Sequence, residues 1–205
     1  MLKPVISADS HVCEPPDCYS ARIDKKFKDR APRMVNDPKR GDVFQIEGSA
    51  QRIPMSLVSA AGKSPEDLSP IGAVFDKLHR GGWEPHARVQ AQDEDGIAAE
   101  VIYPSVGMEL CNIPDIELKA ASMDAYNLWL AEFCDPYPHR LIGCGQTPVK
   151  DPASGIADLE KLKGMGFRGV MLPGVPGTLE YNDEAYGEFF DAIIDLELVP
   201  SFHIL

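Results

Sequence analysis

The sequence predicts an α/β fold with a parallel sheet. From residue 97 onward, short apolar segments alternate with segments of helical periodicity, and Gly, Pro or Asp residues separate them. This alternation is typical of βαβ units, whose strands run parallel. The apolar segments are short and rich in β-branched residues, which indicates strands that are buried on both faces of the sheet.

Five strands are expected in this sheet. They cover residues 5–8, 98–103, 141–144, 168–172 and 199–203. Four helices should connect them, and capping residues indicate where these helices begin and end. Gly96 can close the first helix, while Asp115 and Asp151 can accept hydrogen bonds from the first turns of the second and third. Asn182 or Asp183 can open the fourth.

Residues 14–84 interrupt this regular pattern. They are polar and proline-rich, with one small hairpin expected between residues 42–47 and 51–54. We interpret the segment as an insertion into a single domain that covers residues 1–205. It is expected to fold over the carboxyl ends of the strands and to contribute little to the core, because it carries little apolar area.

The strand count leaves two architectures open. A closed (β/α)8 TIM barrel requires about 250 residues, so a barrel would be represented here by its first five strands. A complete doubly wound sheet of five strands would fit the length of 205 residues. That second fold commonly binds phosphate at a glycine-rich loop after the first strand, whereas Asp9, Ser10 and His11 occupy this position.

Asp9 and His11 are the strongest candidates for a functional site. Side chains two residues apart point to the same side of a strand, so a carboxylate and an imidazole would lie side by side. Both are ligand types for zinc or manganese. His203 ends another predicted strand and is a third candidate ligand. In the alternative without a metal, His11 caps a turn and His203 is an ordinary core residue.

Tyr103 and Ser105 are candidates for substrate binding. They follow the second predicted strand, at the end of the sheet that also carries the candidate ligands. In barrel enzymes, this end of the sheet holds the active site. No catalytic residue is assigned within the chain. His79, His86 and His139 are expected on the surface.

Composition argues against several classes of function. The formal net charge of −12 disfavours nucleic acid and anionic membranes as partners, since both require clustered Lys and Arg. No segment approaches a membrane span of about 20 apolar residues, and no secretion signal is evident. The five cysteines are scattered without a CxxC pair, so we expect reduced thiols in a cytoplasmic protein.

Seven short segments together resemble the amidohydrolase-related family, the branch of the amidohydrolase superfamily typified by aminocarboxymuconate-semialdehyde decarboxylase. The first reads Ser7-Ala8-Asp9-Ser10-His11-Val12 and is followed by Glu14-Pro15. The second reads Glu100-Val101-Ile102-Tyr103-Pro104. The others cover residues 126–130, 138–143, 166–173, 183–186 and 200–203. Their common order and spacing make the resemblance specific.

The resemblance implies a TIM barrel of which this chain holds the first five strands. It implies one divalent metal, zinc as first choice and manganese as second, bound by Asp9, His11 and His203. Asp9 stands where the family usually has a His. A catalytic His after the sixth strand and an Asp ligand after the eighth are expected to follow Leu205. The implied function is metal-dependent decarboxylation or hydrolysis of a small carboxylated, aromatic-derived compound.

Three hypotheses of different classes are therefore considered. The first is the metal-dependent carboxy-lyase or hydrolase. The second is a truncated, catalytically inactive chain that acts only by association. The third is a non-enzymatic, flavodoxin-like binding module. A half barrel would leave two apolar edge strands open, and such edges pair with other chains, so a homo-oligomer is expected.

Overall fold

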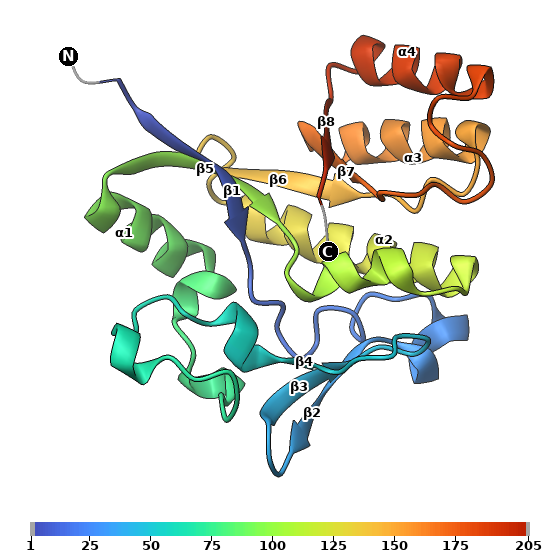
Figure 1. Ribbon diagram of the computed structural model, residues 1–205. Coiled ribbons are helices and arrows are strands. Elements are labelled where there is room, and N and C mark those ends of the chain that lie inside the picture. The colour runs from blue at the N-terminus through green and yellow to red at the C-terminus, as the bar shows by residue number, and fades with distance from the viewer. Residues whose placement is uncertain (1–2, 204–205) are drawn as a thin grey trace.

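The main sheet contains five parallel strands that are ordered as they occur in the chain (Figure 1). The computed structural model describes residues 3–203. The strands are β1 (Val5–His11), β5 (Ile97–Tyr103), β6 (Leu141–Gln146), β7 (Gly169–Leu172) and β8 (Val199–Phe202). A doubly wound sheet would reverse its strand order at a switch point. The continuous order is instead that of the first part of a (β/α)8 barrel, as the resemblance implied.

Four helices connect the strands close to the predicted positions. They are α1 (Pro85–Asp95), α2 (Ile116–Cys134), α3 (Pro152–Gly164) and α4 (Gly187–Asp195). Asp115 caps α2, and Asp151 forms a capping box with Ser154 at the start of α3. Gly96 closes α1 with a φ of 71°, which glycine adopts without strain. None of these helices is both long and apolar enough to cross a membrane, within the part of the chain that is described.

The core lies mainly between the sheet and these helices. Because alternate strand residues point to opposite faces, Ile102 and Val170 face the helices, whereas Tyr103 and Met171 face the concave side. The helix-facing residues join one large cluster with apolar side chains of α2, α3 and α4. On the concave side, Tyr103, Cys144 and Met171 form a separate small cluster. The concave face therefore carries an apolar floor.

Residues 14–84 form a second, three-stranded antiparallel sheet at the end of the molecule toward which β1 points (Figure 1). Its strands are β2 (Arg33–Asp37), β3 (Gly41–Gln45) and β4 (Ile53–Pro54), preceded and followed by short 3-10 helices. The predicted hairpin is confirmed, since Val43 pairs with Pro54 and Phe44 with Ile53. The β2–β3 hairpin was not predicted.

The expectation that this segment contributes little to the core is wrong. Tyr19, Phe44 and Met55 are fully buried and belong to the same cluster as the helix-facing side of the main sheet. The rings of Tyr19 and Phe44 meet edge to face, with centroids 5.9 Å apart. The average composition of the segment is polar, but its large apolar side chains are concentrated on the surface that packs against the barrel.

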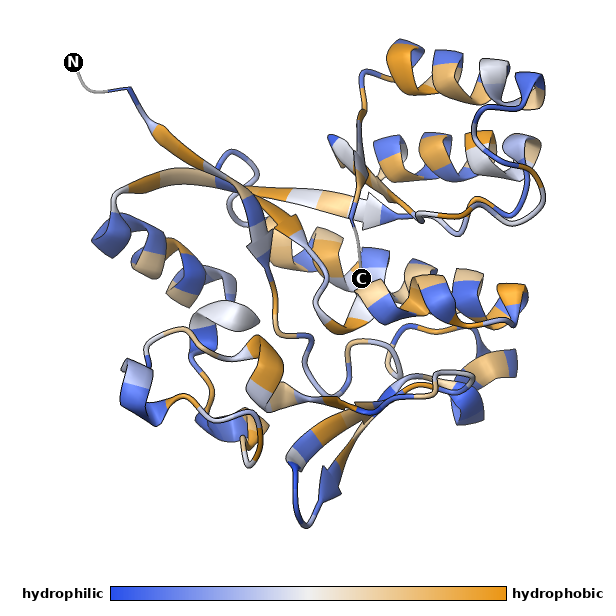
Figure 2. Cartoon of the chain, viewed as in Figure 1, coloured by the Kyte–Doolittle hydropathy of each residue, from blue (hydrophilic) through white to orange (hydrophobic). Residues whose placement is uncertain are grey.

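β1 and β8 are the two edges of the main sheet. Val5 is 56% exposed and Val199 is 67% exposed. The beginning of β1 is coloured apolar in Figure 2. These edge strands therefore have the residue types of buried strands, but among the described residues each has a neighbouring strand on one side only.

Candidate metal centre

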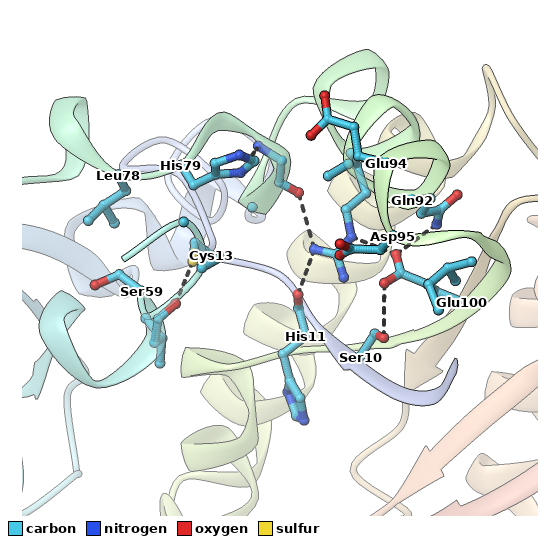
Figure 3. Close-up of a pocket in the computed structure, with 18 residues that line it drawn as sticks. Ser10, His11, Cys13, Ser59, Leu78, His79, Gln92, Glu94, Asp95 and Glu100 are labelled. Atoms are coloured by element: carbon cyan, nitrogen blue, oxygen red, sulfur yellow. Dashed lines mark hydrogen bonds and ion pairs between the residues drawn. The ribbon is translucent and has the colours of Figure 1, made fainter. Parts of the chain in front are cut away.

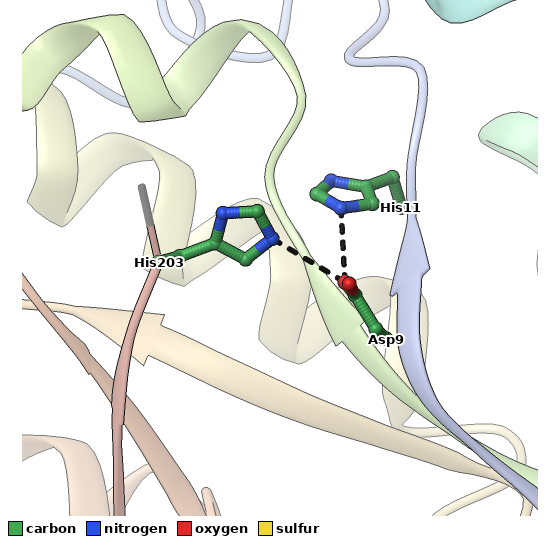
Figure 4. Close-up of side chains that lie close together, drawn as sticks. All are labelled: Asp9, His11 and His203. Atoms are coloured by element: carbon green, nitrogen blue, oxygen red, sulfur yellow. Dashed lines mark hydrogen bonds and ion pairs between the residues drawn. The ribbon is translucent and has the colours of Figure 1, made fainter. Parts of the chain in front are cut away.

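The carboxyl ends of β1 and β8 bring three candidate ligands together (Figure 4). Asp9 and His11 lie in β1, and His203 directly follows β8. The Oδ1 atom of Asp9 lies 3.1 Å from Nε2 of His11 and 3.3 Å from Nε2 of His203. The three donor atoms all lie within 4.8 Å of one another. The residues predicted as ligands therefore converge, although they come from opposite edges of the sheet.

The curvature of the sheet explains this convergence. β5 and β8 are separated by two strands, yet the hydroxyl of Tyr103 on β5 donates a hydrogen bond of 3.0 Å to Oγ of Ser201 on β8. This bond crosses the concave face. Residues at the carboxyl ends of β1 and β8 can consequently meet above the same hollow, as they do in a barrel.

Hydrogen bonding fixes the orientation of the His11 ring. Its Nδ1 atom lies 2.7 Å from the carbonyl oxygen of Pro104. A carbonyl oxygen can only accept, so Nδ1 carries the hydrogen and donates it. In the neutral ring, Nε2 then presents its lone pair to the carboxylate of Asp9. Two electron-rich atoms 3.1 Å apart repel each other unless a proton or a metal cation lies between them.

This donor set fits a divalent metal. One carboxylate oxygen and two imidazole nitrogens suit zinc or manganese. A histidine ligand commonly donates its second ring N–H to a backbone carbonyl, which is the bond that His11 makes to Pro104. The side chain of Asp9 is 68% exposed, so an ion can reach the three donors from solution.

Tyr103 lies beside the candidate ligands, whereas Ser105 is turned toward the interior. The ring centroid of Tyr103 is 5.2 Å from that of His203 and 6.0 Å from that of His11. Burial raises the pKa of Tyr103, which keeps its phenol protonated. Ser105 is 8% exposed, and its backbone N–H donates to Glu14. Substrate binding by either residue stays a prediction.

The prediction missed Glu14, which is completely buried. Its carboxylate accepts hydrogen bonds from three successive backbone N–H groups, those of Ser105, Val106 and Gly107, at 3.0, 3.1 and 2.8 Å. Burial raises the pKa of Glu14, and the three N–H groups act in the opposite direction. A carboxylate three residues after His11 was a visible signal, but its partners are about ninety residues away.

On the outer face of β1, a network of polar side chains borders a cavity of about 430 Å³ (Figure 3). Arg88 of α1 donates to the carbonyl oxygen of His11 at 3.0 Å and to the carboxylate of Glu100 at 2.6 Å. Ser10 and Gln92 also donate to Glu100. In Figure 3, the His11 ring points away from this cavity, which is therefore distinct from the metal centre.

Comparison with known proteins identifies the family. The family model described as amidohydrolase matches residues 77–205. The chain belongs to the amidohydrolase family, which confirms the resemblance seen in the sequence. No curated protein matches the sequence.

Solved structures share the fold. An amidohydrolase from Mycobacterium avium subsp. paratuberculosis superposes with a TM-score of 0.76 at 24% identity, over 100% of this chain and 59% of its own. The 2,6-dihydroxybenzoate decarboxylase from Rhizobium gives 0.57 at 15% identity, over 98% and 50%. The 5-carboxyvanillate decarboxylase from Novosphingobium aromaticivorans, complexed with manganese, gives 0.53 at 18% identity, also over 98% and 50%.

The chain thus spans between 50% and 59% of the length of these structures. At such identities, the likeness establishes the fold, a partial TIM barrel.

Proposed function

We propose that the protein is a metal-dependent carboxy-lyase that removes carbon dioxide from a small, carboxylated, aromatic-derived compound. One observation is the main support for this proposal, namely the convergence of Asp9, His11 and His203 at the carboxyl ends of β1 and β8. Hydrolysis at the same centre is the alternative chemistry within the family.

The fold neighbours support decarboxylation and manganese. One neighbour is a 2,6-dihydroxybenzoate decarboxylase, and another is a 5-carboxyvanillate decarboxylase complexed with manganese. Manganese accepts the same mixture of carboxylate and imidazole donors that zinc does. We therefore propose that the site binds either zinc, which the sequence suggested, or manganese, which this neighbour supports.

The residues on the concave face suit an aromatic carboxylate. When bound by the three donors, a divalent metal supplies a Lewis acid that orients and polarises a substrate oxygen. Tyr103 lies next to these donors and packs with the buried side chains of Cys144 and Met171, so the floor beneath the donors is apolar, which suits an aromatic ring. Tyr103 is held by Ser201, so its ring is fixed before substrate arrives.

Metal titration tests the first half of the proposal. The protein is stripped with a chelator, and Mn²⁺ and Zn²⁺ are added in separate calorimetric titrations. We expect one ion per chain, and the replacement His203→Ala should weaken binding at least tenfold because it removes one of three donors. His139→Ala, which changes an exposed histidine, is the matched control and should bind like the native protein. Absence of stoichiometric binding would contradict the proposal.

A decarboxylation assay tests the second half of the proposal. The metal-loaded protein is incubated with 2,6-dihydroxybenzoate and with 5-carboxyvanillate, and the decarboxylated phenols are quantified by chromatography. Product should form with the native protein and with His139→Ala but not with His203→Ala. Stoichiometric metal binding without product from either acid would retain the metal site and reject this substrate class.

A further inference from the structure

We propose that Glu14 is a positioning residue for the metal centre, because it fixes the turn whose first carbonyl orients His11. This proposal rests on the metal site proposed above. The carboxylate of Glu14 accepts its hydrogen bonds from Ser105, Val106 and Gly107, and none of these three is a candidate ligand. It acts through the backbone that follows β5, and the steps of this connection are all visible as hydrogen bonds or direct chain neighbours.

The first step is the bond between Glu14 and the turn. Oε1 of Glu14 accepts from the N–H groups of Ser105 and Gly107, and Oε2 accepts from that of Val106. These residues begin η6 (Val106–Asn112), the 3-10 helix that follows β5. Three hydrogen bonds from consecutive residues to one carboxylate define the path of the backbone at this point. Bonds to a charged acceptor are stronger than those between neutral groups.

The second step leads from the turn to Pro104, which directly precedes it. Gly107 packs against this proline so closely that a Cβ atom on Gly107 would lie 2.7 Å from Cβ of Pro104. The carbonyl oxygen of Gly107 accepts a hydrogen bond of 2.9 Å from Nε2 of Gln146 on β6. The turn is therefore held from one side by Glu14 and from the other by Gln146, and Pro104 has little freedom to move.

The third step leads from Pro104 to His11. The carbonyl oxygen of Pro104 lies 2.7 Å from Nδ1 of His11 and keeps the ring hydrogen on that atom. Only this tautomer leaves the Nε2 lone pair free to bind a metal beside Asp9. If the turn relaxed, the Pro104 carbonyl would move and the ring could place its hydrogen on Nε2. The structure thus links a buried carboxylate to the tautomer of a candidate ligand.

A purely structural role for Glu14 makes a different prediction. In that case, replacement would lower the stability of the protein but leave the His11 ring unchanged at temperatures where the protein is folded. The tautomer of His11 is therefore the decisive measurement. It is read from the ¹⁵N shifts and long-range couplings of the imidazole ring in the metal-free protein, so it does not depend on activity or on metal binding.

The test compares Glu14→Gln with Asp158→Asn. The second change is a matched carboxylate-to-amide replacement on α3, where Asp158 accepts from the hydroxyl of Thr147 at 2.7 Å. We expect His11 to carry its hydrogen on Nδ1 in the native protein and in Asp158→Asn, and to populate the Nε2–H tautomer in Glu14→Gln. An unchanged His11 ring in folded Glu14→Gln would overturn the proposal.

Gln146→Met provides a second route if Glu14→Gln does not fold. It removes the bond to the Gly107 carbonyl from the opposite side of the turn and leaves Glu14 in place. It should shift the His11 tautomer in the same direction, and an unchanged ring in this variant would also overturn the proposal.

Manganese titration gives an independent measurement. In Glu14→Gln, the affinity for Mn²⁺ should fall about tenfold, the lower end of the range for residues that orient metal ligands. The same affinity in Glu14→Gln and the native protein would contradict the proposal. If the native protein binds neither Mn²⁺ nor Zn²⁺, the metal site itself is rejected, whereas the tautomer measurement still decides the role of Glu14.

Discussion

Charged residues at the outer face of β1 hold the strand that carries two of the candidate ligands. Arg88 and Glu100 are both largely buried, and Arg88 also binds the carbonyl oxygen of His11. Burial alone would raise the pKa of Glu100, but the hydrogen bond and positive charge of Arg88 outweigh it. The pKa of Glu100 therefore lies below its usual value.

Glu100→Gln is expected to destabilise the protein by about 3 kcal/mol at pH 7, because Arg88 would be left buried without its counter-charge. The free energy of unfolding from urea titrations measures this loss. Glu160→Gln, on the exposed side of α3, is the control and should change the free energy by less than about 0.5 kcal/mol. A loss equal to that of the control would show that the Arg88–Glu100 pair contributes nothing to the free energy of unfolding.

The same substitution should alter the dependence of stability on pH. Because folding lowers the pKa of Glu100, its contribution is complete above the unfolded pKa near 4.5 and is lost as the pH falls through the lower, folded value. The native protein should therefore lose more stability than Glu100→Gln when the pH is lowered from 6 to 3. Parallel losses in the two proteins would contradict this assignment.

Residues of the site differ in how far the sequence could predict them. Asp9 and His11 are two positions apart in one strand, so local periodicity is enough to place their side chains together. To predict that His203 lies near them, the parallel topology was also needed, and the strand–helix alternation and the resemblance supplied it. Glu14 was missed because its three partners lie far away in the sequence, and no periodic pattern connects a carboxylate to distant backbone N–H groups.

At the level of elements, the turn between β2 and β3 depends on Gly41. Its φ is 79°, and a Cβ atom there would overlap the carbonyl oxygen of Ala73. Gly72 has a similar φ of 90°, but no atom lies within 4 Å of its Cβ position. Substitutions at the two glycines therefore distinguish the cost of backbone strain from the cost of steric overlap.

Gly41→Ala should destabilise the protein by about 1 to 3 kcal/mol more than Gly72→Ala, because only the first adds overpacking to the strain of a positive φ. Thermal or urea unfolding of the two variants measures the difference. Equal losses would mean that the segment around Ala73 moves aside freely and that the packing of the second sheet against this segment is loose.

Helices were easier to predict than the second sheet. Asp115 and Asp151 are local signals, since a capping side chain bonds to N–H groups two or three residues away. The pairing of β3 with β4 was also local and was predicted. Tyr19 and Phe44 are buried in a cluster with residues of helices that are distant in the sequence. This burial could not be predicted from the composition of residues 14–84, which is polar on average.

On the scale of the whole molecule, the open edges of the main sheet are the most consequential feature. Val5 and Ile6 on β1, and Val199 and Phe202 on β8, are all more than half exposed. Exposed apolar edge strands are templates for pairing with another chain. The expectation of a homo-oligomer, derived from the sequence, therefore gains a structural rationale and stays a prediction.

Residues 1–205, expressed alone, should self-associate in a concentration-dependent manner. The double substitution Ile6→Lys with Val199→Lys should shift them toward the monomer, because buried lysine charges oppose edge pairing. Sedimentation velocity at several concentrations measures both effects. A double substitution on the exposed face of α3, Glu160→Lys with Lys163→Glu, is the control. A native protein that sediments as a monomer at every concentration would contradict the prediction.

The order of the strands also has a kinetic consequence. β6, β7 and β8 each pair with the strand that precedes them by one helix, whereas β1 pairs with β5 only after residues 14–84 have been spanned. Closing a longer loop costs more chain entropy, and such contacts form late during folding. Pulsed hydrogen exchange should therefore protect the amides of β6 and β7 before those of β1. Since β1 carries Asp9 and His11, the candidate metal ligands would be among the last parts of the molecule to come together.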